Sequence, residues 1–244
     1  MLRYFLIPLL LLMAWSAAAQ AQAQAQAQVP QCSLPDKIDI QACPQSGPKR
    51  GQAGDFDYYV LALSWSPDHC ATSKRPDELQ CRDNRFGFVA HGLWPQYRKG
   101  HGRPVDGGWP QYCAPTKPPP ADLQRQHLCR MPSSRLIACQ WAKHGSCGDF
   151  GDGVAGARRY LEAIAQAMDR IALPALKPGS MRVGDLVEAM RQANPGLQAG
   201  QVAVLLRDGH LQELRICLTR DLAHFAACDT DVGGSNKKQK LQVR

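Results

Sequence analysis

Residues 56–66, which read Phe-Asp-Tyr-Tyr-Val-Leu-Ala-Leu-Ser-Trp-Ser, decide the fold of this chain. Apolar and polar side chains alternate along much of this stretch, as in a β-strand that buries one face. A second strand is predicted over residues 86–90, Phe-Gly-Phe-Val-Ala, and it would deliver His91 at its end. Functional side chains are common where a rigid strand gives way to a loop, so His91 is a candidate.

Helical and extended patterns are mixed in the rest of the chain. Residues 96–120 are dense in Gly and Pro and are predicted to be mostly loop. Helical spacing and capping predict three helices, over residues 135–144, 156–171 and 183–193. Two more strands, residues 202–206 and 211–218, flank Asp208-Gly209, a hairpin signal. Because strands and helices do not alternate regularly, the predicted class is α+β, with a mainly antiparallel central sheet and flanking helices.

The N-terminus has the pattern of an export signal. Arg3 supplies a positive charge, a short apolar core follows, and Ser16-Ala17-Ala18-Ala19 offers small residues for cleavage after Ala19. A membrane anchor is the competing interpretation, but the apolar run is too short for one. The predicted organisation is a signal peptide (1–19), a low-complexity and irregular arm (20–54), one folded domain (55–230) and a basic disordered tail (231–244).

Composition narrows the class of protein further. The chain has 10 cysteines, and an even number behind an export signal indicates disulfides formed in an oxidising compartment. Structural zinc is disfavoured because no pair has the Cys-x-x-Cys spacing. The net charge is +8, with a basic cluster at Arg98, Lys99, His101 and Arg103, which favours a polyanion such as nucleic acid as partner. We expect a periplasmic or extracellular protein.

Two short segments carry the chemistry. One is His91-Gly92-Leu93-Trp94-Pro95, and the other is Trp141-Ala142-Lys143-His144-Gly145-Ser146-Cys147. Two imidazoles can move a proton off one oxygen and onto another, and a lysine can stabilise an anionic phosphorus centre between them. Helical spacing would also place Gln140, Lys143 and His144 near one face.

With these motifs the chain resembles the ribonuclease T2 family. Its first motif is identical to one active-site segment of that family, and the second resembles the family pattern His-Glu-Trp-x-Lys-His-Gly-Thr-Cys. The resemblance covers roughly residues 55–228. It implies that the folded domain is a catalytic domain that cleaves single-stranded RNA by transesterification through 2′,3′-cyclic phosphates. His91 would be the general acid, His144 the general base, Lys143 the stabiliser of the transition state, and Trp94 a wall of the base site.

The second motif departs from the family pattern at two positions. Gln140 replaces the usual glutamate, and Cys139 replaces the histidine that contacts phosphate in the family. Gln140 stays in the candidate catalytic set because it can still form hydrogen bonds. The resemblance also implies the disulfides Cys113–Cys147 and Cys217–Cys228. Cys70 and Cys81 form a plausible local pair, and the remaining four cysteines could pair as Cys32–Cys43 and Cys129–Cys139.

Two other classes of function compete with this interpretation. The departures at Cys139 and Gln140 are compatible with a catalytically weakened RNA-binding protein on the same fold. A metal-dependent nuclease would need a carboxylate cluster, and only Asp149 and Asp152 lie near the second motif, without ligand spacing. We expect no cofactor, no metal, no DNA cleavage, no membrane association and a monomeric protein.

Overall fold

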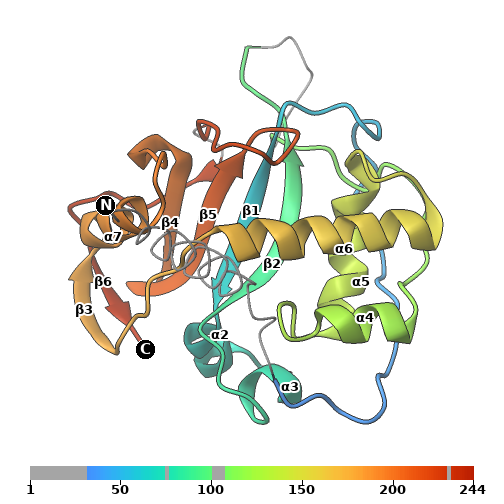
Figure 1. Cartoon of the computed structure of the whole chain (residues 1–244), viewed down its shortest axis with the longest axis horizontal. Helices are drawn as coiled ribbons and strands as arrows, with labels where there is room; N and C mark the ends of the chain where they lie inside the picture. The colour runs from blue at the N-terminus through green and yellow to red at the C-terminus, as the bar shows by residue number, and fades with distance from the viewer. Residues whose placement is uncertain (1–31, 75–76, 101–107, 230–231) are drawn as a thin grey trace, which may run out of the picture. The chain divides into compact units, whose positions relative to one another are not determined.

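The computed structural model describes residues 32–74, 77–100, 108–229 and 232–244 (Figure 1). The predicted signal peptide, His101 and Arg103 lie outside these residues. The described part of the chain contains, in order, β1 (Tyr58–Trp65), α2 (Ser66–Thr72), α3 (Glu78–Cys81), β2 (Phe88–Gln96), α4 (Ala121–His127), α5 (Ser134–Lys143), η1 (Gly145–Cys147), α6 (Gly153–Arg170), β3 (Gly179–Arg182), α7 (Val183–Ala193), η2 (Ala199–Gln201), β4 (Val202–Arg207), β5 (His210–Leu218) and β6 (Lys240–Val243). No helix among them is long and apolar enough to cross a bilayer.

The strands form one sheet in the order β2-β1-β5-β6-β3, with β4 paired to β5. Strand β1 lies antiparallel between β2 and β5, so the stretch of residues 56–66 is the centre from which the sheet extends. Strands β4 and β5 form the predicted hairpin, in which Asp208 and Gly209 have φ angles of 50° and 77°. Two successive positive φ angles suit the tight turn that matches the twist of a hairpin. The α+β class with a mainly antiparallel sheet is confirmed.

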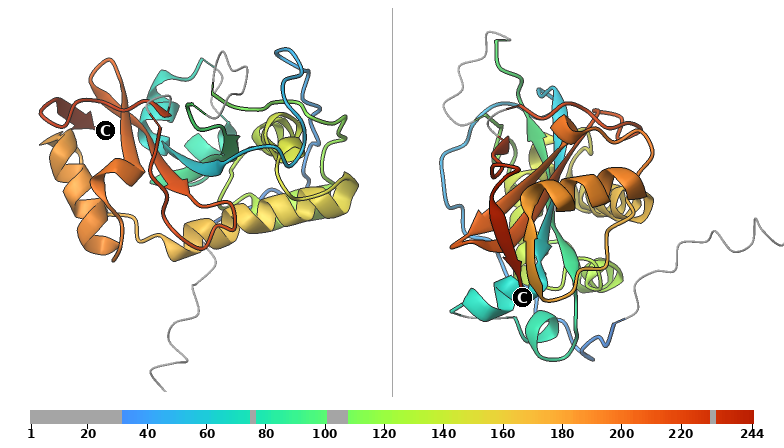
Figure 2. Two further views of the ribbon diagram at one scale, coloured as in Figure 1. Left: turned by 90° about the horizontal axis from the view of Figure 1, so that it is seen from above. Right: turned by 90° about the vertical axis from the view of Figure 1, so that its left-hand side faces the viewer.

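The two faces of the sheet have different roles. Alternate residues of β1, such as Leu61 and Leu63, pack into the main hydrophobic core with Tyr160 and Leu161 of α6. Figures 1 and 2 show α6 running along this side of the sheet. The opposite face carries Val60 and its neighbours in a smaller cluster. The large core stabilises the sheet on one face, and the pocket described below lies on the opposite face, beside Val60.

Strand β2 is longer than the sequence indicated. The expectation was a strand over residues 86–90 that ends before His91, but β2 spans Phe88–Gln96 and contains the whole first motif. Strand β2 lies at the end of the sheet order, and an edge strand tolerates a proline such as Pro95 because not every backbone N–H must pair.

The C-terminal segment corrects a second expectation. Residues 231–244 were expected to be a disordered tail, but Lys240–Val243 form β6, which pairs antiparallel with β3. Leu241 and Val243 are buried, whereas Lys240 and Gln242 are exposed. The lysines of this segment suggested a solvated end and masked a short alternation of apolar and polar residues.

Five disulfides close the structure, and two of them tie down the N-terminal arm. Three join the pairs anticipated from the sequence: Cys70–Cys81, Cys113–Cys147 and Cys217–Cys228. The other two are Cys32–Cys129 and Cys43–Cys139, so the pairing Cys32–Cys43 and Cys129–Cys139 is wrong. The arm has no helix or strand between Cys32 and Cys43. Cys32 pairs with Cys129 just after the end of α4, and Cys43 pairs with Cys139 within α5.

Candidate active site

A β-bulge in β2 sets the direction of His91. Ala62 of β1 pairs with Gly92, and Leu63 pairs with Ala90, so His91 is the extra residue between them. Such a bulge re-aims a side chain and is common next to active sites. Without it, His91 and Trp94 would point to opposite faces, since side chains alternate along a strand. With it, both line the same pocket.

Helix α5 supplies the other half of the site. Its first turn is capped by Ser133, whose side chain accepts a hydrogen bond from the backbone N–H of Leu136. The helix ends at Lys143, and the backbone N–H of His144 still donates to the Gln140 carbonyl. Gln140, Lys143 and His144 therefore project from the last turn toward β2, as the helical spacing predicted.

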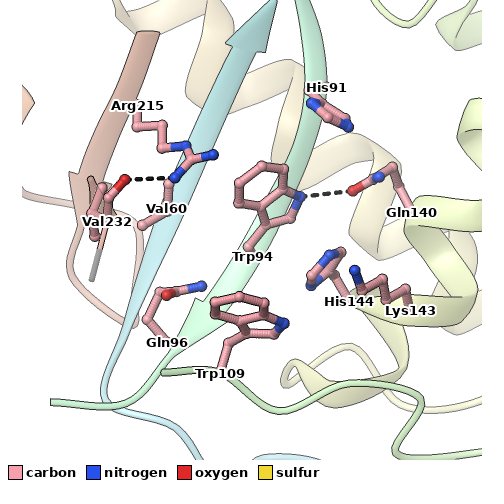
Figure 3. Close-up of a pocket in the computed structure, with 10 residues that line it drawn as sticks. All are labelled: Val60, His91, Trp94, Gln96, Trp109, Gln140, Lys143, His144, Arg215 and Val232. Atoms are coloured by element: carbon pink, nitrogen blue, oxygen red, sulfur yellow. Dashed lines mark hydrogen bonds between the residues drawn. The ribbon is translucent and has the colours of Figure 1, made fainter. Parts of the chain in front are cut away.

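These side chains surround a cavity of about 210 Å³ between β2 and α5 (Figure 3). The structure thus brings His91, Trp94, Gln140, Lys143 and His144 together in one pocket. The residues lining it are Val60, His91, Trp94, Gln96, Trp109, Gln140, Lys143, His144, Arg215 and Val232. The half-buried Trp109 and the strand residue Arg215 were not singled out from the sequence as part of the site.

The indole of Trp94 contacts most of the polar groups of the pocket. It stacks on His144 at a centroid distance of 5.3 Å and lies in a T-shaped arrangement with His91 at 5.1 Å. Its Nε1 donates a 2.7 Å hydrogen bond to Oε1 of Gln140, and the guanidinium of Arg215 lies 5.1 Å from the ring centroid. Trp94 therefore holds the two imidazoles at fixed positions relative to each other.

Gly92 makes the approach of these groups possible. A Cβ atom at this position would lie 2.7 Å from Trp94 Nε1 and would overlap Gln140 Oε1. Any larger residue would push apart the hydrogen bond that joins β2 to α5. Gly145 has the same kind of role on the other motif, because a Cβ there would overlap the Trp141 ring and lie 3.0 Å from Tyr160. The motif glycines thus serve packing.

His144 is held in its neutral form. Its side chain is buried, with 4% exposed, and Nδ1 has no hydrogen-bond partner among the described residues. Burial, the charge of Lys143 and the proximity of His91 all lower the pKa of His144 well below its ordinary value. A neutral imidazole at neutral pH can accept a proton.

His91 lies in the opposite kind of environment. Its Nδ1 is 2.7 Å from Oε2 of Glu213, a side chain of β5 that is only 7% exposed. Burial alone would raise the pKa of Glu213, but the hydrogen bond and charge of His91, together with Arg215, hold that pKa below its ordinary value. His91 therefore contacts an anion, whereas His144 lies beside the cation of Lys143. Two histidines with opposite electrostatic surroundings therefore share one pocket.

Glu213 and Arg215 lie outside the two motifs from which the site was predicted. A signal was present: Glu213 and Arg215 alternate with Leu214 and Ile216, so two charged side chains share one face of a predicted strand. The register places Arg215 opposite Ala62, which itself faces Gly92 on the other side. This puts the polar face of β5 beside the pocket.

Comparison with known proteins identifies the family of this chain. A model of the ribonuclease T2 family matches residues 56–176. A ribonuclease of Aeromonas hydrophila is 34% identical over 188 residues, which cover 75% of this chain and 81% of that protein. The chain belongs to the ribonuclease T2 family. It is an endoribonuclease. A probable ribonuclease of Haemophilus influenzae is 36% identical over 152 residues, which cover 58% of this chain and 52% of that protein.

Solved structures of ribonucleases share the fold. An RNase-related protein from Calystegia sepium has a TM-score of 0.56 at 20% identity, covering 77% of this chain and 96% of that one. RNase NT in complex with 5′-AMP has a TM-score of 0.54 at 19% identity, covering 78% of this chain and 98% of that one. The central sheet and flanking helices are therefore those of ribonuclease T2 proteins.

The two departures of this ribonuclease T2 chain have structural uses. Cys139 forms the disulfide to Cys43 and so attaches the N-terminal arm to the helix of the site. Gln140 is buried, with 7% exposed, and accepts the hydrogen bond from Trp94. Both positions therefore hold neighbouring parts of the structure against α5.

Asp149, one of the two acidic residues near the second motif, is paired elsewhere. Its carboxylate forms an ion pair of 2.7 Å with Arg220. Among the described residues, no group of three His, Cys, Asp or Glu side chains is placed to hold a metal ion. The polar groups that converge on the pocket are imidazoles, amides and cations.

Proposed function

We propose that this endoribonuclease cleaves single-stranded RNA without a metal ion, by transesterification through 2′,3′-cyclic phosphates. One observation carries the proposal: two histidines of one pocket lie in opposite electrostatic surroundings, the arrangement that separates a general base from a general acid. His144 is buried beside Lys143, whereas His91 contacts the carboxylate of Glu213.

The first step forms the cyclic phosphate. Neutral His144 takes the proton of the 2′-OH as its oxygen attacks phosphorus, and His91 gives a proton through Nε2 to the departing 5′-oxygen, because its Nδ1 is engaged by Glu213. Lys143 is half-buried at the end of α5, where its ammonium can stabilise the negative charge that develops on the phosphoryl oxygens. In a second step the two histidines exchange roles, and water opens the cyclic phosphate.

We assign binding of an RNA base to the aromatic side chains of the pocket. Trp94 and Trp109 both line the cavity, and an unpaired base presents a flat face that an aromatic side chain can stack against. Duplexes hide these faces, so the pocket suits single strands. We further propose that the protein is exported, since five disulfides need an oxidising compartment, and that it acts as a monomer.

The attacking group gives the direct test of this mechanism. RNA with free 2′-OH groups should be cut in the presence of EDTA, and fragments ending in 2′,3′-cyclic phosphate should appear before those ending in 3′-phosphate. DNA and 2′-O-methylated RNA of the same sequence should remain intact, because neither carries the nucleophile. Mass spectrometry of the products over time measures this. Cleavage of 2′-O-methylated RNA at the rate of the parent strand would overturn the proposal.

A Gln140→Glu variant tests what the missing family carboxylate does. The new side chain keeps an oxygen for Trp94 Nε1 but adds a negative charge beside Lys143 and His144, which offsets the cations that lower the His144 pKa. We expect kcat to rise and the acidic limb of the profile of kcat/KM against pH to move to higher pH. A variant that matches the parent in both would show that the carboxylate acts in the family only through its hydrogen bond.

A further inference from the structure

A carboxylate reaches the site from β5, on the side opposite to α5. Oε2 of Glu213 lies 2.7 Å from Nδ1 of His91, and Oε1 of the same side chain accepts a 2.7 Å hydrogen bond from Nε of Arg215. Glu213 is not among the residues that line the cavity, and none of those described as lining it is acidic. The carboxylate therefore stands behind His91, away from the substrate.

We propose that Glu213 is the positioning residue of His91: it fixes the tautomer and the orientation of this imidazole so that Nε2 faces the scissile phosphate. This inference rests on the proposed role of His91 as general acid. A carboxylate that accepts from Nδ1–H leaves Nε2 as the nitrogen that meets the substrate. The same division of labour is well known in catalytic triads, where the carboxylate orients a general base.

The bulge in β2 explains why His91 needs such a partner. His91 has no residue opposite it in the register of β1 and β2, and 35% of its side chain is exposed. An unpaired and partly exposed side chain can adopt several rotamers. A rotamer that turns the donor nitrogen away from the substrate lowers the rate of catalysis. Glu213 has the rigidity that His91 lacks, because it lies within a central strand and is 7% exposed.

Arg215 keeps Glu213 in place. Besides its hydrogen bond to Glu213, its Nη1 donates to the Val232 carbonyl at 2.5 Å, and its guanidinium lies against the Trp94 ring. The carboxylate is thus bound on both oxygens, one by the acid and one by an arginine that also contacts the aromatic wall. In this chain the carboxylate near the site comes from β5. The position on α5 where the family pattern has a glutamate holds the uncharged Gln140.

Imidazole and cationic side chains also lie near His91. His144 on α5 and His69 on α2 both feel the charge of His91, which helps to lower the pKa of each of these two neighbours. Arg215 adds a fixed positive charge two residues along from Glu213. Glu213 is the anion among these described neighbours, so its removal should affect the acid step selectively.

Two substrates that differ only in the leaving group test this role. An RNA dinucleotide releases a 5′-alkoxide that must be protonated, whereas a nucleoside 3′-(4-nitrophenyl phosphate) releases a phenolate that leaves without an acid. Glu213→Gln should lower kcat on the dinucleotide by about 10- to 100-fold, a part of the 10²–10⁴-fold that a positioned acid contributes. On the aryl ester it should leave kcat unchanged. His91→Ala is the reference and should show the same selectivity with a larger loss.

Three further measurements separate positioning from general support of the fold. Glu188→Gln removes a carboxylate that pairs with Arg191 at 2.7 Å on α7, outside the site, and should leave both rates unchanged. The double variant His91→Ala/Glu213→Gln should be no slower than His91→Ala, since Glu213 acts only through His91. Nitrogen NMR of the His91 ring should show the proton on Nδ1 in the neutral parent and a mixture of tautomers in Glu213→Gln.

The outcomes divide cleanly. An equal loss on both substrates, or no loss on the dinucleotide, overturns the role of Glu213, provided that His91→Ala is selective. If His91→Ala itself slows both substrates equally, His91 is not the acid, and the proposed function fails at that point together with the inference built on it. A thermal unfolding midpoint measured for each variant identifies one that has simply lost its fold, in which case Glu213→Asp, which keeps the charge, replaces Glu213→Gln.

Discussion

Replacing His91 or His144 with alanine is expected to lower kcat by about 10²–10⁴-fold, which is what a positioned general acid or base contributes. The two losses should not multiply in the double variant, because the histidines act on opposite sides of one transition state and each is of little use without the other. Cleavage of a short RNA under saturating substrate measures the effect. Near-normal turnover in either variant would remove that histidine from the mechanism.

The acidic limb of the pH profile should report the protonation of His144. His144 must be neutral to act as base, and burial, Lys143 and His91 lower its pKa well below 6.5. In the free enzyme, kcat/KM should therefore rise as pH increases through a value on the acidic side of 6.5. His144→Ala should abolish this acidic limb and lower the rate. His224→Ala, an exposed histidine of the loop after β5, is the matched control and should change neither.

Much of the fold followed from local patterns. The alternation in residues 56–66 predicted the central strand, Asp208-Gly209 predicted the hairpin, and helical spacing predicted α7 with its observed bounds, Val183–Ala193. These elements are set by neighbours in the sequence, so their patterns are readable there. The Cys32–Cys129 and Cys43–Cys139 disulfides were not, because they depend on the path of an arm that has no pattern of its own.

Some residues of the site could be predicted from local motifs, but their orientation could not. His91, Trp94, Lys143 and His144 lie in two motifs, and the structure brings all four to one pocket. Their orientation depends on features between strands: the bulge that turns His91, and the register that brings Glu213 beside it. A bulge depends on how two strands pair, so a sequence that shows which residues matter does not by itself show which nitrogen faces the substrate.

Lys143→Gln is expected to produce the second large loss, about 10²–10³-fold in kcat, the usual effect of removing one group that stabilises charge in a transition state. Lys143 is half-buried, so its charge is screened less than that of an exposed lysine. The Gln side chain keeps most of the length and can still donate a hydrogen bond. The loss therefore measures the charge, and Lys143→Arg should recover part of it.

The same variant should also move the pH profile, in a direction that the geometry fixes. Burial is the main cause of the low pKa of His144, and the charge of Lys143 is the next. Removing that charge raises the pKa, so the acidic limb of kcat/KM should shift to higher pH, while burial keeps it from reaching the ordinary histidine value. Lys177→Gln, which removes an exposed lysine after α6, should change neither the rate nor the limb. A loss of rate without a shift of the limb would mean that Lys143 acts on the phosphate alone. A shift of the limb without a loss of rate would mean that Lys143 acts only through His144. Because Lys143 lies beside His144 in one pocket, we expect both effects together.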